Sequence, residues 1–121
     1  MTWDDVARLA HTFPGVEDGT CFHTPAFRVR GKLIGRLHED GDDLILRMER
    51  DTRAVLLRMR QDIFYITDHY LPYDWVRVRL AAVGEPELRE VFADAWRSQA
   101  PKKLVAEHER AQAGNHAAPA T

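Results

Sequence analysis

Three segments of the chain, residues 27–37, 44–48 and 75–81, alternate apolar with polar or charged residues at a period of two. The alternation is clearest in 75–81, where valine and leucine alternate with arginine. Successive side chains of a β-strand point to opposite faces, so these segments predict strands with one apolar and one charged face. Such strands form a sheet that helices cover on one side only.

Turn signals divide the strand region into about five strands. Gly31-Lys32 is expected to form a hairpin turn within 25–37, and Asp40-Gly41-Asp42 predicts a second turn before the strand at 44–48. Residues 63–67 and 75–81 predict the last two strands, joined by a loop at 68–74. Residues 17–20 are expected to be a polar loop.

Apolar residues at helical spacing predict four helices. The first spans about residues 3–13 and starts with a capping arrangement of Thr2 and Asp5. The second starts at Asp51, and a long third helix after Pro86 is separated by Pro101 from a short fourth helix. The predicted fold is α+β, a single antiparallel sheet packed on helices in the order α-β-β-β-α-β-β-α-α.

The length of 121 residues suits one domain, which we expect to span 1–112, followed by a disordered tail at 113–121. No apolar run approaches the ~20 residues that a membrane span requires, and the N-terminus lacks the pattern of a signal peptide. Cys21 is the single cysteine and cannot form an internal disulfide. We therefore expect a cytoplasmic protein without a membrane partner.

The charged face of the predicted sheet is unusually basic for a chain of net charge −2. Glu49 is the only acid expected on it, whereas arginine can bind phosphate oxygens through two hydrogen bonds and exposed aromatic rings can stack on unpaired bases. This face predicts DNA binding, and the alternative is a solvated face that keeps the sheet soluble. The expected members are seven cations and two aromatic residues: Arg28, Arg30, Lys32, Arg36, Arg47, Arg77, Arg79, Tyr65 and Trp75.

The loop at 68–74 offers a second candidate site. His69 and Tyr70, with Trp75 and Tyr65 nearby, could form a pocket at one end of the sheet for a small anionic ligand or a partner protein. A histidine that only bonds to the loop backbone is the alternative. Lys102 and Lys103 begin a helix, where positive charge opposes the helix dipole and hints at a role outside folding, and we count both among the expected nucleic-acid-binding residues.

No catalytic, nucleotide-binding or zinc motif is present, so we expect neither an enzyme nor a cofactor. The carboxylate pairs Asp4-Asp5 and Glu17-Asp18 leave a third hypothesis, weak binding of a hard cation. Such pairs usually only solvate a surface.

Several runs together resemble the MmcQ/YjbR family: residues 24–32, 65–70, 75–78, 95–96 and 100–104. The resemblance extends from about Trp3 to Glu109 and implies a CyaY-like fold. The resemblance also implies DNA binding, the role that the family is commonly given, and no established catalytic residues. A net charge of −2, however, disfavours tight binding to duplex DNA. The positions that match the family's motifs are Arg28, Arg30, Lys32, His69, Tyr70, Trp75, Arg77, Lys102 and Lys103.

Overall fold

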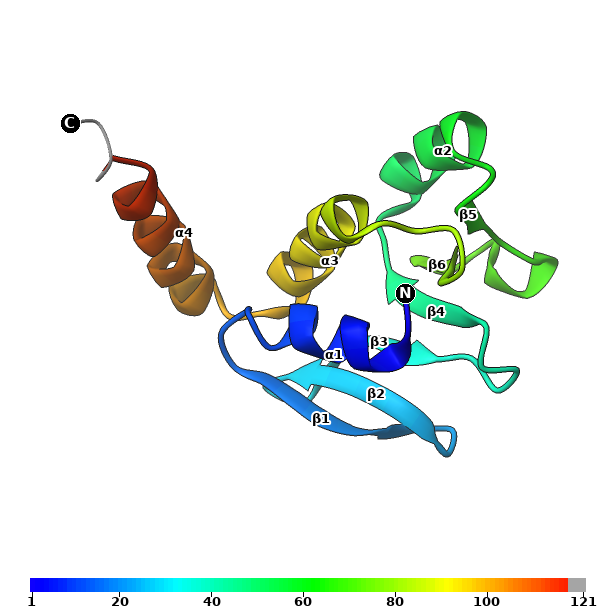
Figure 1. Ribbon diagram of the computed structural model, residues 1–121, viewed down its shortest axis with the longest axis horizontal. Helices are drawn as coiled ribbons and strands as arrows, with labels where there is room; N and C mark the ends of the chain where they lie inside the picture. Colours follow the sequence, from blue (N-terminus) through cyan, green and yellow to red (C-terminus); the bar gives the residue numbers. More distant parts are fainter. Residues whose placement is uncertain (118–121) are drawn as a thin grey trace.

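The computed structural model describes residues 1–117 (Figure 1). Its fold is α+β, as the alternation and the helical spacing predicted, with four α-helices and six strands. The elements follow in the order α1 (Trp3–Ala10), β1 (Val16–Cys21), β2 (Thr24–Val29), β3 (Lys32–Leu37), β4 (Asp43–Arg47), α2 (Arg50–Met59), β5 (Phe64–Tyr65), the 3₁₀ turn η1 (Asp68–Tyr70), β6 (Trp75–Arg79), α3 (Glu85–Gln99) and α4 (Lys102–Ala117).

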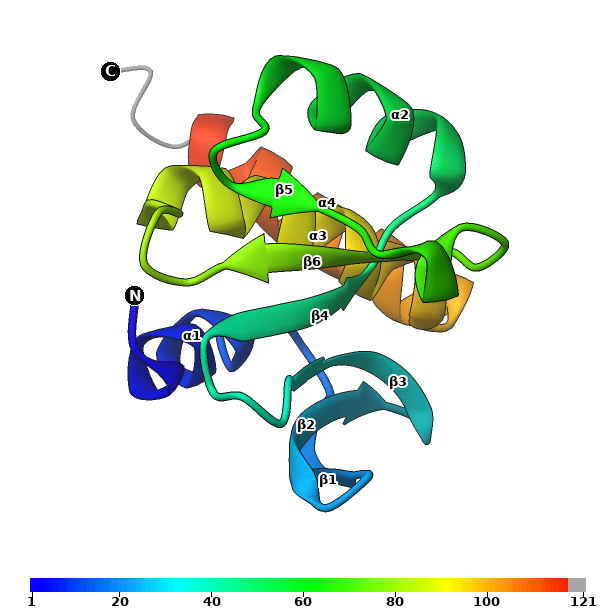
Figure 2. The same ribbon diagram turned by 90° about the vertical axis from the view of Figure 1, so that its right-hand side faces the viewer.

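The strands form one antiparallel sheet in the order β1-β2-β3-β4-β6-β5. Helices α1 and α3 pack on one face, and Figure 2 shows the strands in front of them. The core between the layers contains Phe92 and Trp96 of α3 together with Val6 of α1, all at most 1% exposed. The Trp96 indole Nε1 donates a hydrogen bond to the carbonyl of Pro14 at 2.9 Å, which satisfies its one polar group. We call the opposite face of the sheet the open face.

Strand β1 occupies the segment that the sequence predicted to be a polar loop. It pairs with β2 over its full length, from Val16 opposite Val29 to Cys21 opposite Thr24. The prediction was wrong because an edge strand needs only backbone pairing on one side, and its exposed residues then carry no apolar alternation. The sheet therefore has six strands rather than about five.

A β-bulge interrupts the alternation that the sequence predicted to run unbroken through β2 and β3. The register between these strands shifts next to Phe27, so that Ile34 is an extra residue and is fully buried in the core. As a result Leu33 projects to the open face as the partner of Arg28. The hairpin turn lies at Arg30-Gly31, with φ of 52° and 82°, one residue before the predicted turn.

Two helix boundaries also differ from the prediction. Helix α1 has the predicted capping box between Thr2 and Asp5, but it ends at Ala10 and residues 11–13 form a turn. Helix α4 is long rather than short and continues to Ala117, so residues 113–117 extend this helix. The rest of the predicted tail, 118–121, lies outside the described residues.

Candidate functional site

The open face carries five of the seven predicted cations. Cross-strand partners share a face, and the rows Arg36–Ile45–Arg77–Tyr65, Asp43–Arg79 and Arg47–Trp75 all lie opposite the core residues of the same strands. Arg28 lies on this face beside Leu33. The predicted sharing of one face therefore holds for Arg28, Arg36, Arg47, Arg77 and Arg79, with Tyr65 and Trp75.

Two of the seven predicted cations, Arg30 and Lys32, do not lie on the open face. Arg30 lies in the hairpin turn with a left-handed backbone and belongs to neither strand. Lys32 pairs with Val29, whose side chain is in the core, so Lys32 belongs to the helix-covered side at the end of the sheet. The assignment of both residues to the open face was wrong because the turn and the bulge interrupt the alternation between them.

Acidic residues neutralise three of the five arginines on the open face. Arg77 pairs with Asp43 at 2.6 Å and with Asp40 at 2.9 Å. Arg36 pairs with Glu39 at 3.0 Å and Arg47 with Asp74 at 3.4 Å. Asp43 is itself on the open face and 4% exposed, so the prediction that Glu49 is the only acid there was wrong. Glu49 is instead the N-cap residue of α2.

Tyr65 belongs to this charged network. Its hydroxyl donates a hydrogen bond to the Asp43 carboxylate, and the Arg79 guanidinium carbon lies 4.0 Å from the centre of its ring. Burial, together with the hydrogen bond and the charge of Asp43, raises the pKa of Tyr65 to about 12. For Arg77, burial lowers the pKa but the hydrogen bond and charge of Asp43 outweigh it, so the pKa is raised. The network thus favours the protonated tyrosine and the charged arginine.

A pocket of about 300 Å³ lies on the open face between the β1–β2 turn and the loop that follows η1. His69, Tyr70 and Trp75 line it, at the place where the sequence predicted a pocket, whereas Tyr65 does not and lies in the Asp43 network. The floor comes from β3 and β4, and most of the lining is aromatic or aliphatic. The lining residues are Phe22, Leu33, Arg36, Ile45, His69, Tyr70, Tyr73 and Trp75.

The loop wall of this pocket is held by Arg53 of α2, a residue that the sequence did not single out. Arg53 is 5% exposed, and burial lowers the pKa of its guanidinium. It has no ion pair in the described part of the chain. Instead its guanidinium donates four hydrogen bonds of 2.6–3.0 Å to the backbone carbonyls of Tyr70, Leu71, Tyr73 and Trp75.

The opposite wall is Phe22, in the two-residue turn between β1 and β2. Phe22 and His23 both have left-handed backbones, with φ of 51° and 68°. Turns of this kind favour Asn-Gly, because a side chain larger than that of glycine is strained at positive φ. Phe22 is 74% exposed, and the centre of its ring lies 5.1 Å from the guanidinium carbon of Arg36.

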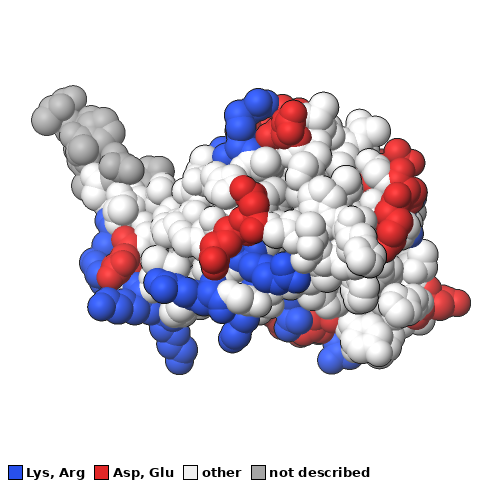
Figure 3. Space-filling view, turned by 90° about the horizontal axis from the view of Figure 1, so that it is seen from below, with Lys and Arg blue, Asp and Glu red and all other residues white. Residues whose placement is uncertain are grey.

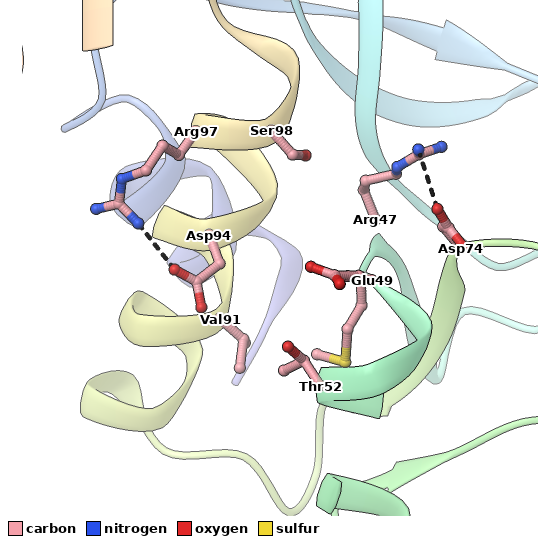
Figure 4. A pocket seen from close by; sticks show the side chains of 9 residues that line it. Arg47, Glu49, Thr52, Asp74, Val91, Asp94, Arg97 and Ser98 are labelled. Carbon is pink, nitrogen blue, oxygen red and sulfur yellow. Dashed lines mark hydrogen bonds and ion pairs between the residues drawn. The ribbon is translucent and has the colours of Figure 1, made fainter. Parts of the chain in front are cut away.

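A larger cleft of about 540 Å³ lies between α2 and α3. Figure 4 shows Glu49 between two ion pairs, Arg47–Asp74 at 3.4 Å and Arg97–Asp94 at 2.8 Å. Because both arginines already bind a carboxylate, the cleft offers a ligand little unpaired positive charge.

The carboxylates of the cation-binding hypothesis are partly engaged. Asp5 accepts a hydrogen bond from the Thr2 backbone at 2.9 Å and pairs with Arg8, and Asp18 contacts His11 at 2.9 Å. Among the side chains that the structure describes, no group of three or more His, Cys, Asp or Glu residues could hold a metal ion. None of the helices described combines the length and the hydrophobicity of a membrane span.

The two other predicted cations of the sheet lie toward one end of the molecule together with the two lysines predicted at the start of α4. We call this end, made of Arg30, Lys32, Lys102 and Lys103, the basic end. The α3–α4 junction is tied to β3 by a hydrogen bond from Gln99 to the Leu33 carbonyl at 2.9 Å. This contact places the start of α4 beside the β2–β3 turn (Figures 1 and 2). All four side chains are exposed, and none forms an ion pair with a residue that the structure describes. Figure 3 shows Lys and Arg side chains toward this end, with Asp and Glu side chains among them.

Comparison with known proteins relates the chain to uncharacterised relatives. It is 29% identical over 122 residues to the uncharacterized protein Rv2570 of Mycobacterium tuberculosis and equally to Mb2600 of Mycobacterium bovis, covering 86% of this chain and 92% of each relative. The crystal structure of Deinococcus radiodurans protein DR2400, which contains the domain DUF419, has the same fold. It matches with a TM-score of 0.66 and 18% identity over 78% of this chain and 75% of that chain. The YjbR family model matches residues 11–98. The chain therefore belongs to the YjbR family, as the sequence motifs indicated.

Proposed function

We propose that this domain is a non-catalytic binding module that contacts nucleic-acid phosphates through its basic end. The observation that carries the proposal is the convergence of Arg30 and Lys32 with Lys102 and Lys103, from two distant parts of the chain, none of which forms an ion pair within the described residues. Unpaired cations gathered on one surface concentrate positive potential even when the net charge is negative.

The basic end fits this role better than the open face. Three of the five arginines there already pair with carboxylates, and a phosphate would have to displace those partners. Arg28 and Arg79 have no such partner in the described chain, but each donates a hydrogen bond to a backbone carbonyl at 2.8 Å. Phosphate binding over the whole face would therefore lose existing interactions, whereas the basic end loses none.

The test is the salt dependence of binding to a short fluorescent DNA duplex, measured by anisotropy. Four phosphate contacts predict that affinity falls by about 150-fold between about 50 and about 200 mM salt. The double variant Lys102→Ala, Lys103→Ala should reduce the salt slope by about 2. Arg58→Ala is the control, because Arg58 is an exposed arginine of α2 without an ion pair in the described residues. Absence of binding at low salt, or an equal effect of Arg58→Ala, would refute the proposal.

The second candidate function is recognition of a small ligand or a partner on the open face. It is supported by the concave pocket around His69, Tyr70 and Trp75, a site distinct from the basic end.

A further inference from the structure

We propose that the pocket on the open face binds one planar aromatic ring that carries an anionic group, with the ring between Phe22 and Trp75 and the anion at Arg28. This inference concerns residues other than those of the basic end. It names the ligand class from the shape, the hydrogen-bonding groups and the charge of the site.

The shape of the pocket suits a small flat molecule. Its volume of about 300 Å³ lies at the lower limit of ligand pockets in proteins. One wall is the Phe22 ring, the other is formed by His69, Tyr73 and Trp75, and the floor includes Ile45. Aromatic rings stack or meet edge to face with favourable energy beyond the area they bury, so these walls favour a ring over an aliphatic chain.

Polar groups of the pocket are available to the edge of such a ring. Tyr70, Tyr73 and Trp75 line the cavity, and within the described chain neither tyrosine hydroxyl nor the Trp75 indole N–H has a hydrogen-bond partner. By contrast, Tyr65 and Trp96 each form a hydrogen bond through the equivalent group. A heteroaromatic ring can accept or donate at its edge and so use these groups.

The conformation and exposure of Phe22 indicate that this wall of the pocket has a role other than stabilising the fold. Two consecutive left-handed residues cost about 1–2 kcal/mol each relative to a relaxed backbone, and a 74% exposed phenyl ring returns little by burial. Backbone strain of this kind gathers at ligand sites, where the surrounding structure maintains it. A ligand that covers the phenyl ring explains why phenylalanine occupies this position.

Charge places the anion on the β2 side of the pocket. Arg36 lies in the floor but pairs with Glu39. Arg28 does not line the pocket, but it is the cross-strand partner of the floor residue Leu33. Its guanidinium extends over Gly19, where a Cβ atom would come within 3.2 Å of Nη1. It donates to the Thr20 carbonyl at 2.8 Å and forms no ion pair in the described chain, although Glu17 is its partner on β1. The remaining guanidinium donors of Arg28 are free for a carboxylate or a phosphate.

The experiment titrates two matched pairs of probes, indole-3-acetate with indole-3-acetamide and adenosine monophosphate with adenosine. The readout is the set of indole N–H signals in a ¹H–¹⁵N NMR spectrum. The Trp75 signal should shift on binding, while that of the buried, hydrogen-bonded Trp96 should not. The anionic member of at least one pair should bind about tenfold more tightly than its neutral partner, and the pair that shows this distinguishes a carboxylate from a phosphate ligand.

Three variants separate the contributions. Arg28→Gln should abolish the difference within the pair. Phe22→Asn and His23→Gly both introduce residues that the turn favours, so each should fold at least as stably as the parent. Binding should survive His23→Gly and weaken at least tenfold in Phe22→Asn. Lys102→Ala, Lys103→Ala should leave probe binding unchanged even if it abolishes DNA binding. No shift of the Trp75 signal with either pair at millimolar probe, or full binding by Phe22→Asn, would overturn the inference.

Discussion

Replacing Arg53 with methionine should lower the free energy of unfolding by about 2–6 kcal/mol. The substitution keeps a long unbranched side chain but removes the donors of four hydrogen bonds to loop carbonyls. Leu71 and Tyr73 are exposed, so water can reach their carbonyls after the change. Tyr70 and Trp75 are half-buried, and each carbonyl left without a partner there costs about 1–3 kcal/mol. The sum of these two costs gives the range.

Urea denaturation measures this effect, and two further variants make the comparison specific. Arg50→Met is the matched control, because Arg50 is an exposed arginine on the same helix that pairs with Asp74 at 3.0 Å. An exposed pair contributes about 0–1 kcal/mol. Arg53→Lys keeps the charge and up to three donors, so its destabilisation should be intermediate.

The loop itself should respond in Arg53→Met. Amide hydrogen exchange at residues 70–75 should accelerate more than exchange in α1, because the lost hydrogen bonds all end in this loop. If Arg53→Met and Arg50→Met destabilise the protein equally, Arg53 does not hold the loop wall of the pocket.

Three other predictions concern single positions. The pKa of Tyr65 is raised, so the hydrogen bond of its hydroxyl contributes fully to stability below pH 10, the usual tyrosine pKa, and this contribution is lost as pH rises from there to about 12. In Tyr65→Phe, urea denaturation should show a smaller loss of stability over this pH range. The late step in the absorbance titration of tyrosine should also disappear. Gly35→Ala should destabilise the fold by about 1–3 kcal/mol in thermal unfolding, because a Cβ atom would lie 2.9 Å from the Ile45 carbonyl oxygen. Glu17→Gln should increase the affinity for the anionic NMR probe severalfold by removing the acid opposite Arg28, and an unchanged affinity would argue against an anion there.

The sequence predicted the layers of the fold because strands and helices leave different periodicities. The alternation from Trp75 to Arg79 fixed both the strand and the face on which its arginines lie. The bulge at Ile34 could not be seen in this way, since one extra residue exchanges the faces of its neighbours without changing composition. Strand β1 was missed for a related reason, because its central residues are exposed and leave no apolar pattern.

The sequence predicted residues that line the pocket better than it predicted the charge of the open face. His69, Tyr70 and Trp75 do line one pocket, because they follow one another along a short loop and the start of β6. The acids that neutralise the arginines come from positions outside the alternating pattern, such as Asp40 in a turn and Asp74 in a loop. Arg53 was hidden because its partners are backbone carbonyls, which no side-chain motif reports.

The two walls of the pocket are fixed by unrelated means, and this bears on what the site can bind. Arg53 immobilises the loop wall from a different helix, and the tight β1–β2 turn fixes Phe22 through its backbone. The Arg53 hydrogen bonds also stabilise the fold, but the strained turn with its exposed Phe22 gives nothing to a surface that only needs to remain soluble. A ligand does gain, because walls that are rigid before binding spare the cost of ordering them at the moment of binding. A flat ring that contacts both walls depends most on their spacing, which is the reason to search for aromatic ligands before flexible ones.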